Sequence, residues 1–534
     1  MPKMQRLSRE YDVISKMGYI EKTIPDYLTN NLNSSFSLRE YQVEAISRFI
    51  HYLEKHPNKS MPIQLLFNMA TGSGKTLLMA ANILYLYNRG YRHFLFFVNS
   101  VNIIEKTRDN FLNPLSPKYL FNNKIQFEGR NVGINEALNF EAANENDINI
   151  IFTTIQGLHG KLNLFKENSI TIEDFADKKI ALISDEAHHI NTWTRNRSIG
   201  KKEVELKDTW EGSVSSILNS NSDNIMLEYT ATIDINNANI FEKYKEKIIF
   251  EYDLKQFRID GYSKEVKVLE SDSEALERML KAVILSQYRR KIAEKNGLHL
   301  KPVILFKSRN IEESKENYEL FRDKINGLKA ADIENIEQYS DNTILGKVFQ
   351  YFNRNNIAIQ NLIMELKEDF SLEKCIILDS ENINKDKQLK LNTLENENNE
   401  IRAIFVVNML NEGWDVLNLF DIVRLYDTRD AKGNKPGKTT IAEAQLIGRG
   451  ARYYPFKSES TGDPFKRKFD NLPEDELKII EDLYYHSANN PRYIQELTIA
   501  LKEAGIMPYE TKELELRVKD EIKKRIFGIM HLYL

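Results

Sequence analysis

A glycine-rich segment, MATGSGKT at residues 69–76, contains the residue types that bind phosphate. It follows the apolar run IQLLFN and precedes the helical pattern TLLMAANILYLYN, so a strand, a glycine turn and a helix are expected in that order. Glycine lets backbone amides close around phosphate, Lys75 reaches the β and γ phosphates, and the Thr76 hydroxyl can bind Mg²⁺. The segment predicts a nucleoside triphosphate site made of Thr71, Gly72, Ser73, Gly74, Lys75 and Thr76.

A pair of carboxylates follows another apolar run. The run KIALIS ends directly before DEAHH at residues 185–189. Asp185 can hold Mg²⁺ through water while Glu186 orients and deprotonates an attacking water, which is the arrangement for phosphoryl transfer to water. The two histidines raise the alternative of a zinc site, but no further Cys or His with ligand spacing lies near them in the sequence. The pattern therefore favours triphosphate hydrolysis over zinc binding.

These side chains need a scaffold that places strand ends together, and the hydrophobic pattern predicts one. Short apolar runs alternate with amphipathic stretches from about Leu38 to about Ile249, as in a parallel sheet covered by helices. After the link FEYDLKQFRIDGYSK the alternation starts again. Two α/β lobes are expected, with strands at IQLLFNM, HFLFFVNS, INIIFTT, KIALISD and NIMLEYTA in the first and at PVILFKS, KCIILD, RAIFVVN and DIVRLYD in the second.

The chain is expected to divide into four parts. These are an N-terminal extension at 1–35, a first lobe at 36–250, a second lobe at 251–455 and a helical C-terminal segment at 456–534. A charged stretch at about 312–373 predicts a helical insertion in the second lobe. Strands are expected to stop at Pro455, because LPEDELKIIEDLYYH and PRYIQELTIALKEAG have helical patterns. The last residues carry no cap or stop signal, which predicts a fragment or a truncated chain.

Length and composition limit the class of protein. With 534 residues the chain exceeds the size of one core, and its composition is that of a soluble globular protein. The 74 Lys and Arg against 78 Asp and Glu give a net charge of -4, so a nucleic-acid site must be a local groove. The sequence has no signal peptide and no apolar run of roughly 18 residues, so we expect a cytoplasmic protein without a membrane span.

The order of the motifs resembles a known family. GSGKT followed by DEAH is similar to the DEAH-box, superfamily-two helicases and translocases, which implies two tandem RecA-like lobes with ATP between them. LREYQ at residues 38–42 resembles the adenine-reading motif of that family, where the Gln42 amide pairs with the adenine edge. YTAT at residues 229–232 resembles the motif that ends the first lobe, which implies that Thr230 and Thr232 contact His188 and couple hydrolysis to lobe movement.

Two further segments resemble family motifs of the second lobe. VNMLNEGWDVLN places Gly413 on the γ-phosphate side and Asp415 at the ribose, and QLIGRGAR starts with Gln445, a coupling residue. The resemblance implies that Arg449 and Arg452 are arginine fingers, and their spacing of three puts two guanidiniums on one helix face, where they can spread over developing phosphate charge. The implied catalytic residues are Lys75, Asp185, Glu186, Arg449 and Arg452.

Loops at strand ends are the candidates for nucleic-acid contacts. FVNSVNIIEKTRDNF and FTTIQGL resemble the strand-gripping motifs of the same family, and FKSRN occupies a similar place in the second lobe. Hydroxyl, amide and backbone N–H groups of such loops bind phosphates without reading bases, which suits movement along any sequence. The residues expected to bind nucleic acid are Asn99, Ser100, Thr154, Gln156, Ser308 and Arg309.

A narrower resemblance rests on the unusual EGWD at residues 412–415, together with MATGSGKT, DEAHH, the link and QLIGRGAR. From about Leu38 to Gly505 the chain is similar to the motor subunit of type III restriction enzymes. That family implies duplex DNA and a DNA methyltransferase subunit as partners, and a C-terminal nuclease. The triplet Glu476-Leu477-Lys478 matches a nuclease motif by letter, but its helical pattern and the lack of a preceding strand Asp argue against it, so the nuclease is expected to be absent.

The function expected from the sequence is ATP hydrolysis coupled to movement on DNA, with ATP and Mg²⁺ as cofactors. Two alternatives remain open. One is a stand-alone DNA or RNA helicase, and the other is a truncated, inactive nucleic-acid-binding remnant. The complete set of ATPase motifs argues against the second of these.

Overall fold

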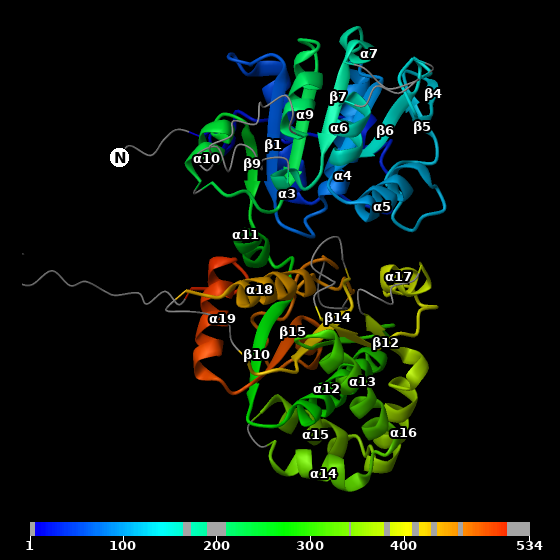
Figure 1. Cartoon of the computed structure of the whole chain (residues 1–534), viewed down its shortest axis with the longest axis vertical. Helices are drawn as coiled ribbons and strands as arrows, with labels where there is room; N and C mark the ends of the chain where they lie inside the picture. The colour runs from blue at the N-terminus through cyan, green and yellow to red at the C-terminus, as the bar shows by residue number, and fades with distance from the viewer. Residues whose placement is uncertain are drawn as a thin grey trace, which may run out of the picture.

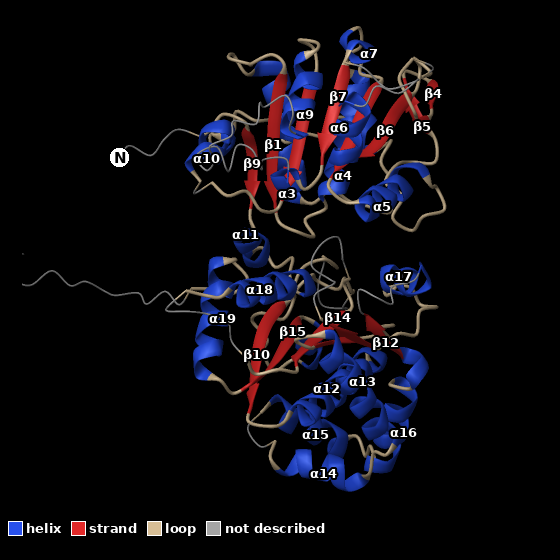
Figure 2. Ribbon diagram, in the orientation of Figure 1, coloured by secondary structure: helices blue, strands red, loops and turns tan. Residues whose placement is uncertain are grey.

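The chain folds into two α/β lobes, which lie one above the other in Figure 1 with α11 (Leu254–Ile259) between them. The computed structural model describes residues 6–141, 143–163, 172–189, 210–235, 237–340, 343–378, 385–407, 416–428, 435–457 and 463–509. Each lobe is a parallel sheet with helices on both faces (Figure 2), so the predicted fold class is confirmed. The predicted residues Gly413 and Asp415 lie outside the described residues.

The first sheet has seven parallel strands in the order β5-β6-β2-β7-β8-β1-β9. Its central strands β2, β7 and β8 are buried along their whole length, which is why they are continuous apolar runs instead of alternating ones. The strands are β1 (Ile63–Met69), β2 (His93–Val98), β5 (Ile134–Glu136), β6 (Ile148–Thr154), β7 (Ile180–Ser184), β8 (Ile225–Thr230) and β9 (Ile248–Tyr252), and β3 (Ile125–Phe127) pairs with β4 (Arg130–Val132) apart from them.

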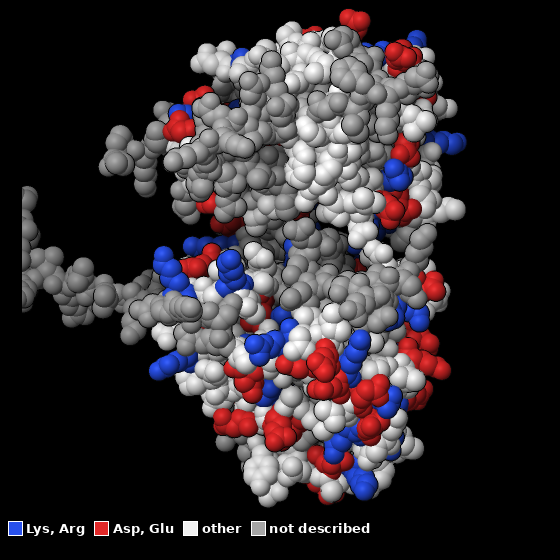
Figure 3. Space-filling model, viewed as in Figure 1, with Lys and Arg blue, Asp and Glu red and all other residues white. Residues whose placement is uncertain are grey.

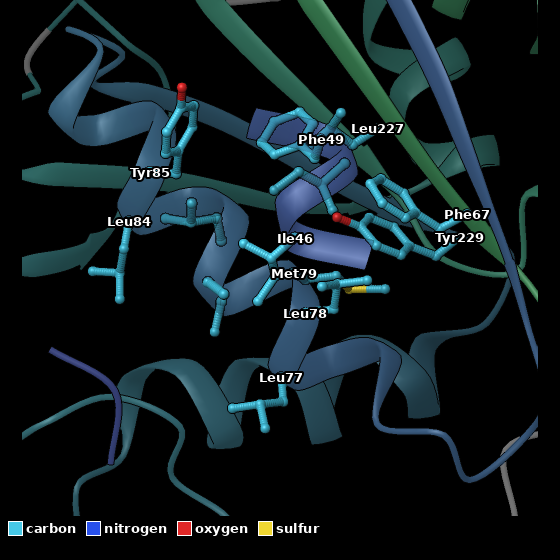
Figure 4. Packing of buried hydrophobic residues seen from close by; sticks show 14 of the residues in the cluster. Ile46, Phe49, Phe67, Leu77, Leu78, Met79, Leu84, Tyr85, Leu227 and Tyr229 are labelled. Atoms are coloured by element: carbon cyan, nitrogen blue, oxygen red, sulfur yellow. The ribbon is translucent and has the colours of Figure 1, made fainter. Parts of the chain in front are cut away.

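Helices cover both faces of the first sheet. Phe67 of β1 and Tyr229 of β8 stack with their ring centroids 5.0 Å apart, and Figure 4 shows Phe49 and Met79 packing near this pair. On this face lie α1 (Leu7–Lys16), α2 (Asp26–Thr29), α3 (Glu40–Lys55), α4 (Lys75–Asn88) and α5 (Val101–Leu112). On the other face lie α6 (Ile155–Asn163), α7 (Glu173–Ala176), α9 (Trp210–Asn219) and α10 (Ala238–Tyr244).

The second sheet has six parallel strands in the order β10-β15-β14-β11-β13-β12. The four runs predicted as strands of this lobe all form strands. The strands are β10 (Glu265–Ser271), β11 (Val303–Lys307), β12 (Cys375–Leu378), β13 (Ala403–Val406), β14 (Leu419–Arg424) and β15 (Asp482–Ala488).

Helices also cover both faces of the second sheet. The predicted insertion forms α-helices between β11 and β12 that pack with α12 on one face, and two of them, α14 and α15, lie at the end of the lobe far from the first lobe (Figure 1). The helices of that face are α12 (Ala275–Lys295), α13 (Ile311–Asn326), α14 (Ala330–Gln338), α15 (Ile344–Arg354) and α16 (Ile359–Asp369). The other face carries α17 (Lys385–Asn392), α18 (Lys438–Gly450) and α19 (Pro491–Glu503). Among the helices described, none is long and apolar enough to cross a bilayer.

The prediction that helices alone follow Pro455 was wrong. Residues 482–488 form β15, which pairs in parallel with both β10 and β14 inside the second sheet. The segment reads as polar because it contains Glu481, Asp482 and His486. In the structure Glu481 is buried and accepts from the Lys468 backbone N–H, and His486 is buried against Asp421 of β14. Among the described residues after Pro455, α19 and a short 3-10 helix at Glu476–Ile480 match the helical expectation.

The joint between the lobes is a cluster of buried aromatic rings. Tyr41 of α3 stacks on Tyr252 at the end of β9, with ring centroids 4.1 Å apart. Tyr262, which follows α11, lies 5.3 Å from the Tyr41 ring and 5.6 Å from the Phe257 ring. Because these rings come from both sides of the link, their packing holds the link in place instead of leaving it as a free tether.

A buried ion pair tests the place of β15 in the second sheet. Asp421 of β14 accepts hydrogen bonds from Arg289 of α12 at 2.5 Å and from His486 of β15 at 2.9 Å, with its side chain fully buried. Asp421→Ala leaves the guanidinium without its buried counter-charge, so we expect the free energy of unfolding to fall by about 3–5 kcal/mol. Urea unfolding measures the change.

Asp323→Asn is the matched control, because the Asp323 side chain is exposed and pairs with a neighbouring exposed arginine. We expect the control to shift the free energy of unfolding by less than about 0.5 kcal/mol. Equal effects of the two substitutions would contradict the description of Asp421 as the buried link between α12, β14 and β15.

Candidate active site

The phosphate-loop segment connects β1 to α4, as its sequence predicts. Gly72 and Gly74 both have left-handed backbone, with φ of +84° and +76°, which residues with a Cβ rarely adopt. Lys75 starts α4, and its Nζ lies 3.3 Å from the Met69 carbonyl oxygen and donates to it. The Lys75 side chain therefore folds back onto the backbone at the start of the phosphate loop.

Two side chains of α3 form hydrogen bonds to the backbone of this loop. The Tyr41 hydroxyl and the Gln42 amide both donate to the Ser73 carbonyl at 2.9 Å. The Gln42 oxygen also accepts from the Arg39 backbone N–H, which caps the start of α3. Gln42 is buried and is not among the residues that line the adjoining cavity, so its predicted pairing with adenine stays a prediction.

The carboxylate pair stands at the end of β7, beside the loop. Asp185 Oδ1 accepts from the Glu186 backbone N–H at 3.0 Å. Burial and the charge of the adjacent Glu186 together raise the pKa of Asp185 to about 6, while Lys75 opposes the shift. Glu186 itself has φ of +50°, a strained conformation for a residue with a Cβ, and such strain is held where the surrounding structure requires it.

A hydrogen bond joins the acidic segment to the end of β8. His188 Nδ1 lies 3.1 Å from the Thr230 hydroxyl and 3.5 Å from Glu186 Oε2. The Thr230 hydroxyl in turn accepts from the Thr232 backbone N–H at 3.2 Å. The structure thus brings together His188, Thr230 and Thr232, three of the four residues expected to couple hydrolysis to lobe movement.

The arginine pair enters from the second lobe, at the end of α18. Arg452 lies directly against the phosphate loop: a Cβ on Gly72 would be 3.0 Å from Arg452 Nε. Burial lowers the pKa of Arg452 to about 10, against the attraction of Glu395 and Glu186. Arg452 therefore contacts a loop of the opposite lobe and lies in the field of a first-lobe carboxylate.

These groups surround one cavity of about 550 Å³ between the lobes. The first lobe contributes the phosphate loop, the carboxylate pair and α5 to the lining. The second lobe contributes the two arginines and residues at the end of α17 and after it. Figure 1 shows α17 on the side of the second lobe that faces α5. The predicted residues that line the cavity are Thr71, Gly72, Gly74, Lys75, Thr76, Asp185, Glu186, Arg449 and Arg452.

Five charged residues that line the cavity were missed from the sequence, namely Glu105, Lys106, Asp109, Lys118 and Glu395. Lys118 of the first lobe and Glu395 of the second form an ion pair across the gap, with Nζ 3.2 Å from Oε2. Lys106 of α5 also lines the cavity, and burial lowers its pKa to about 8, helped by the charges of Lys118 and Arg452. Lys106 lies inside the segment FVNSVNIIEKTRDNF but was not singled out there, because an amphipathic helix reads as solvated surface, and no motif marks Lys118 or Glu395.

The candidate nucleic-acid loops of the first lobe are partly assembled. Gln156 donates from its amide to Asn99 at 2.8 Å, which joins the loop after β2 to the loop after β6. Ser100 lies at the N-terminus of α5, and the Thr154 hydroxyl accepts from the Gly157 backbone N–H. These residues are half-buried or exposed, so they stay candidates for phosphate contacts.

The Ser308 prediction needs correction. Its side chain is fully buried, and its hydroxyl accepts from the Asn317 amide at 3.3 Å, because the strand end turns directly under α13. The hydroxyl therefore faces the interior and not a phosphate. Arg309, the next residue, is exposed and stays a candidate, as does the coupling residue Gln445, which is exposed on α18.

Two glycines test the loop geometry. A Cβ on Gly74 would lie 2.5 Å from Gln42 Nε2, whereas Gly18, with nearly the same φ of +80°, has nothing within 4 Å. Gly74→Ala must displace the loop or Gln42, so we expect its affinity for a fluorescent ATP analogue to fall at least about tenfold, roughly 1.4 kcal/mol. Gly18→Ala meets the same backbone strain without the contact and is expected to keep its affinity. Equal losses would contradict the assigned role of the loop.

Comparison with known proteins places the chain in a family. A family model described as "Type III restriction enzyme, res subunit" matches residues 35–235, and a second, described as "N-terminal region" (HI_1054_N), matches residues 439–510. Among solved structures, the HsdR fragment of a type I restriction enzyme from Vibrio vulnificus is 15% identical, covers 89% of this chain and 68% of its own, and gives a TM-score of 0.41. S. cerevisiae Dbp5 is 12% identical, with 95% and 98% covered and a TM-score of 0.47.

A curated relative carries the family assignment. The "Probable type III restriction-modification enzyme HindVIP Res subunit" of Haemophilus influenzae is 38% identical over 462 residues, which cover 78% of this chain and 89% of the relative. A second protein of H. influenzae, described as uncharacterized, is 43% identical over 83 residues, 15% of this chain and 18% of its own length. The chain therefore belongs to the family of type III restriction-modification Res subunits, as its motifs predicted.

Proposed function

We propose that this chain is the ATP-dependent motor of a type III restriction-modification enzyme and that it moves on DNA by hydrolysing ATP between its two lobes. One observation carries the proposal. A single cavity holds the phosphate-loop lysine and the carboxylate pair of one lobe together with two arginines of the other. Such a composite site can be complete only when the lobes are close, which ties hydrolysis to lobe position.

The side chains that line the cavity have different roles in phosphoryl transfer. Lys75, Arg449 and Arg452 supply positive charge for the phosphate oxygens, where negative charge develops in the transition state. Glu186 orients the attacking water and accepts its proton. Its strained backbone fixes the carboxylate at the mouth of the site, beside Asp185.

Thr76 and Asp185 are the residues that would hold Mg²⁺. The donor set fits that ion, because a hydroxyl and a carboxylate oxygen line the same cavity and Mg²⁺ prefers oxygen ligands. Asp185 is also buried with a raised pKa, so its ionised form lacks sufficient compensating charge from the protein alone. When bound, Mg²⁺ neutralises phosphate charge and orients the triphosphate.

Coupling to movement runs through the strand ends of the first lobe. The hydrogen bond between His188 and Thr230 connects the carboxylate segment to the end of β8. Asn99 and Gln156, joined by their own hydrogen bond, follow neighbouring strands of the same sheet. A change at the carboxylates when the lobes close therefore reaches loops that are placed to grip phosphates.

The substrate is proposed to be duplex DNA, with a DNA methyltransferase subunit as the partner that recognises the site. The name of the Haemophilus relative, a restriction-modification enzyme, supports this pairing. On the face seen in Figure 3, blue and red side chains are mixed over the lower lobe, in keeping with a net charge of -4. Specific recognition by a partner, not global charge, then brings the motor to DNA.

We expect Lys75→Ala and Glu186→Gln to abolish DNA-stimulated ATP hydrolysis, because the first removes the phosphate cation and the second removes the base. A steady-state phosphate-release assay should show at least about a 100-fold lower kcat in each variant. Glu368→Gln, an exposed glutamate on α16, is the matched control and should keep wild-type turnover. Unchanged turnover in both site variants would overturn the proposal.

The alternative of a stand-alone helicase is separable by experiment. A duplex-tracking motor hydrolyses ATP on duplex DNA without releasing a strand, whereas a helicase displaces the strand of a DNA or RNA duplex. ATPase activity with no strand displacement supports the restriction motor, and displacement on RNA duplexes would favour a remodelling helicase.

Nuclease activity is not expected from this polypeptide alone. Glu476 binds Lys295 and Asn296, while Lys478 binds Asp470, so the two charged groups of the triplet point to different neighbours instead of a shared metal site. Incubation of the purified chain with ATP, Mg²⁺ and plasmid DNA should leave the plasmid intact. Double-strand cleavage by the chain free of any partner would show that a nuclease was overlooked.

A further inference from the structure

Lys264 is a buried lysine that stands outside every motif. Only 1% of its surface is exposed, and its Nζ donates to three backbone carbonyls: those of Leu417 at 2.6 Å, Leu419 at 2.8 Å and Gly450 at 3.2 Å. A protonated ammonium has three N–H donors, so three carbonyl acceptors match it completely. The side chain therefore acts as a clamp between two backbone segments.

Both clamped segments are close in sequence to second-lobe residues that were assigned to the nucleotide site. Gly450 is the last residue of α18 and lies between Arg449 and Arg452 in sequence. Leu419 is the first residue of β14, and Leu417 follows the EGWD motif by two positions in the sequence. Lys264 thus ties the end of the arginine-bearing helix to the start of a central strand.

The backbone around Lys264 holds the same residues. The Lys264 N–H donates to the Ala451 carbonyl at 2.6 Å, and Ser263 forms an antiparallel bridge with Arg452. Ser263 and Lys264, which directly precede β10, therefore hold the backbone of residues 450, 451 and 452 in place. Arg452 leaves this anchored backbone to reach Gly72 of the phosphate loop.

A buried cation at this position is costly to desolvate, and the structure shows what offsets that cost. Burial lowers the pKa of Lys264 well below its ordinary value, and Arg289 lies near enough to lower it further. The Phe420 ring, 4.3 Å from Nζ, adds a cation–π contact. An uncharged apolar residue would avoid the desolvation but would leave three buried carbonyls unsatisfied.

The clamp is also connected to the first lobe. Tyr262, two residues before Lys264, packs 5.3 Å from the Tyr41 ring in the aromatic joint. The Tyr41 hydroxyl donates to the Ser73 carbonyl of the phosphate loop at 2.9 Å. The link that carries Lys264 is thus connected to the phosphate loop through Tyr41 and contacts the arginine segment directly.

We propose that Lys264 is a positioning residue that holds Arg452 at the distance and orientation needed for phosphate stabilisation. The inference rests on the proposed function, in which Arg452 acts on the phosphates. Lys264 itself does not line the cavity, so it acts through the backbone of residues 450–452 and not on the nucleotide.

The test is a double-mutant cycle on kcat. Lys264→Met removes the ammonium while it keeps the length of the side chain, and we expect kcat for ATP hydrolysis to fall about 10- to 100-fold, the range caused by displacing a catalytic group by about 1 Å. The Kd for a fluorescent ATP analogue should change less than about twofold, because the phosphate loop is intact. If the Met variant does not fold, Lys264→Gln, a neutral side chain that still donates, takes its place.

The control is Arg402→Met. Arg402 is equally buried in the second lobe, but its guanidinium donates to Pro302, Asp369 and Ser286, none of which belongs to the arginine segment. Its replacement is expected to lower the melting temperature while kcat at 25 °C stays near that of the wild type. A fall in kcat as large as that of Lys264→Met would show that loss of any buried cation is sufficient, and would overturn the inference.

The decisive comparison is the effect of Lys264→Met in an Arg452→Ala background. If Lys264 works through Arg452, it changes kcat there by less than about twofold, since the group it positions is gone. An undiminished fall in that background, or a wild-type kcat in the single variant, would overturn the inference while leaving the motor assignment intact. Full activity of Arg452→Ala itself would instead contradict the proposed function, and the positioning role with it.

Discussion

The contact between Arg452 and Gly72 is the constraint on which the rest of the structure depends. A Cβ on Gly72 would lie only 3.0 Å from Nε of Arg452, a residue of the second lobe. Glycine at this position therefore serves two purposes, because it permits the left-handed backbone of the loop and leaves room for a group from the opposite lobe. The two lobes can approach closely here because Gly72 has no side chain. The distance between the lobes therefore decides whether the nucleotide site contains groups from both.

Charge around the contact is arranged to hold cations that would otherwise repel. Arg452, Lys106 and Lys118 lie on or near one cavity, and Glu395 provides a carboxylate that pairs with Lys118 and attracts the other two. A triphosphate brings more negative charge than Glu395 does. When a nucleotide binds, we expect these cations to pair with its phosphates instead of with Glu395. Electrostatic attraction between the triphosphate and cations of both lobes then favours closure of the lobes on the nucleotide.

The sequence predicted the parts of the fold that are determined locally. Continuous apolar runs identified the central strands of both sheets, and the phosphate loop and carboxylate pair could be read because their chemistry requires neighbouring residues in the chain. β15 was missed because its sequence reads as polar, and the pairing that buries His486 joins it to Asp421, 65 residues away. Ser308 was misjudged because α13 covers it, and Lys264 because its partners are backbone carbonyls more than a hundred residues away.

The central claim is that one nucleotide is bound by both lobes at once. A crystal structure with a non-hydrolysable ATP analogue and Mg²⁺ tests it most directly. The account predicts the analogue in the cavity of about 550 Å³, with Lys75 and Arg452 both within hydrogen-bond distance of its terminal phosphate. An analogue held by the first lobe alone, with Arg452 turned away from the phosphates in a closed protein, would contradict it.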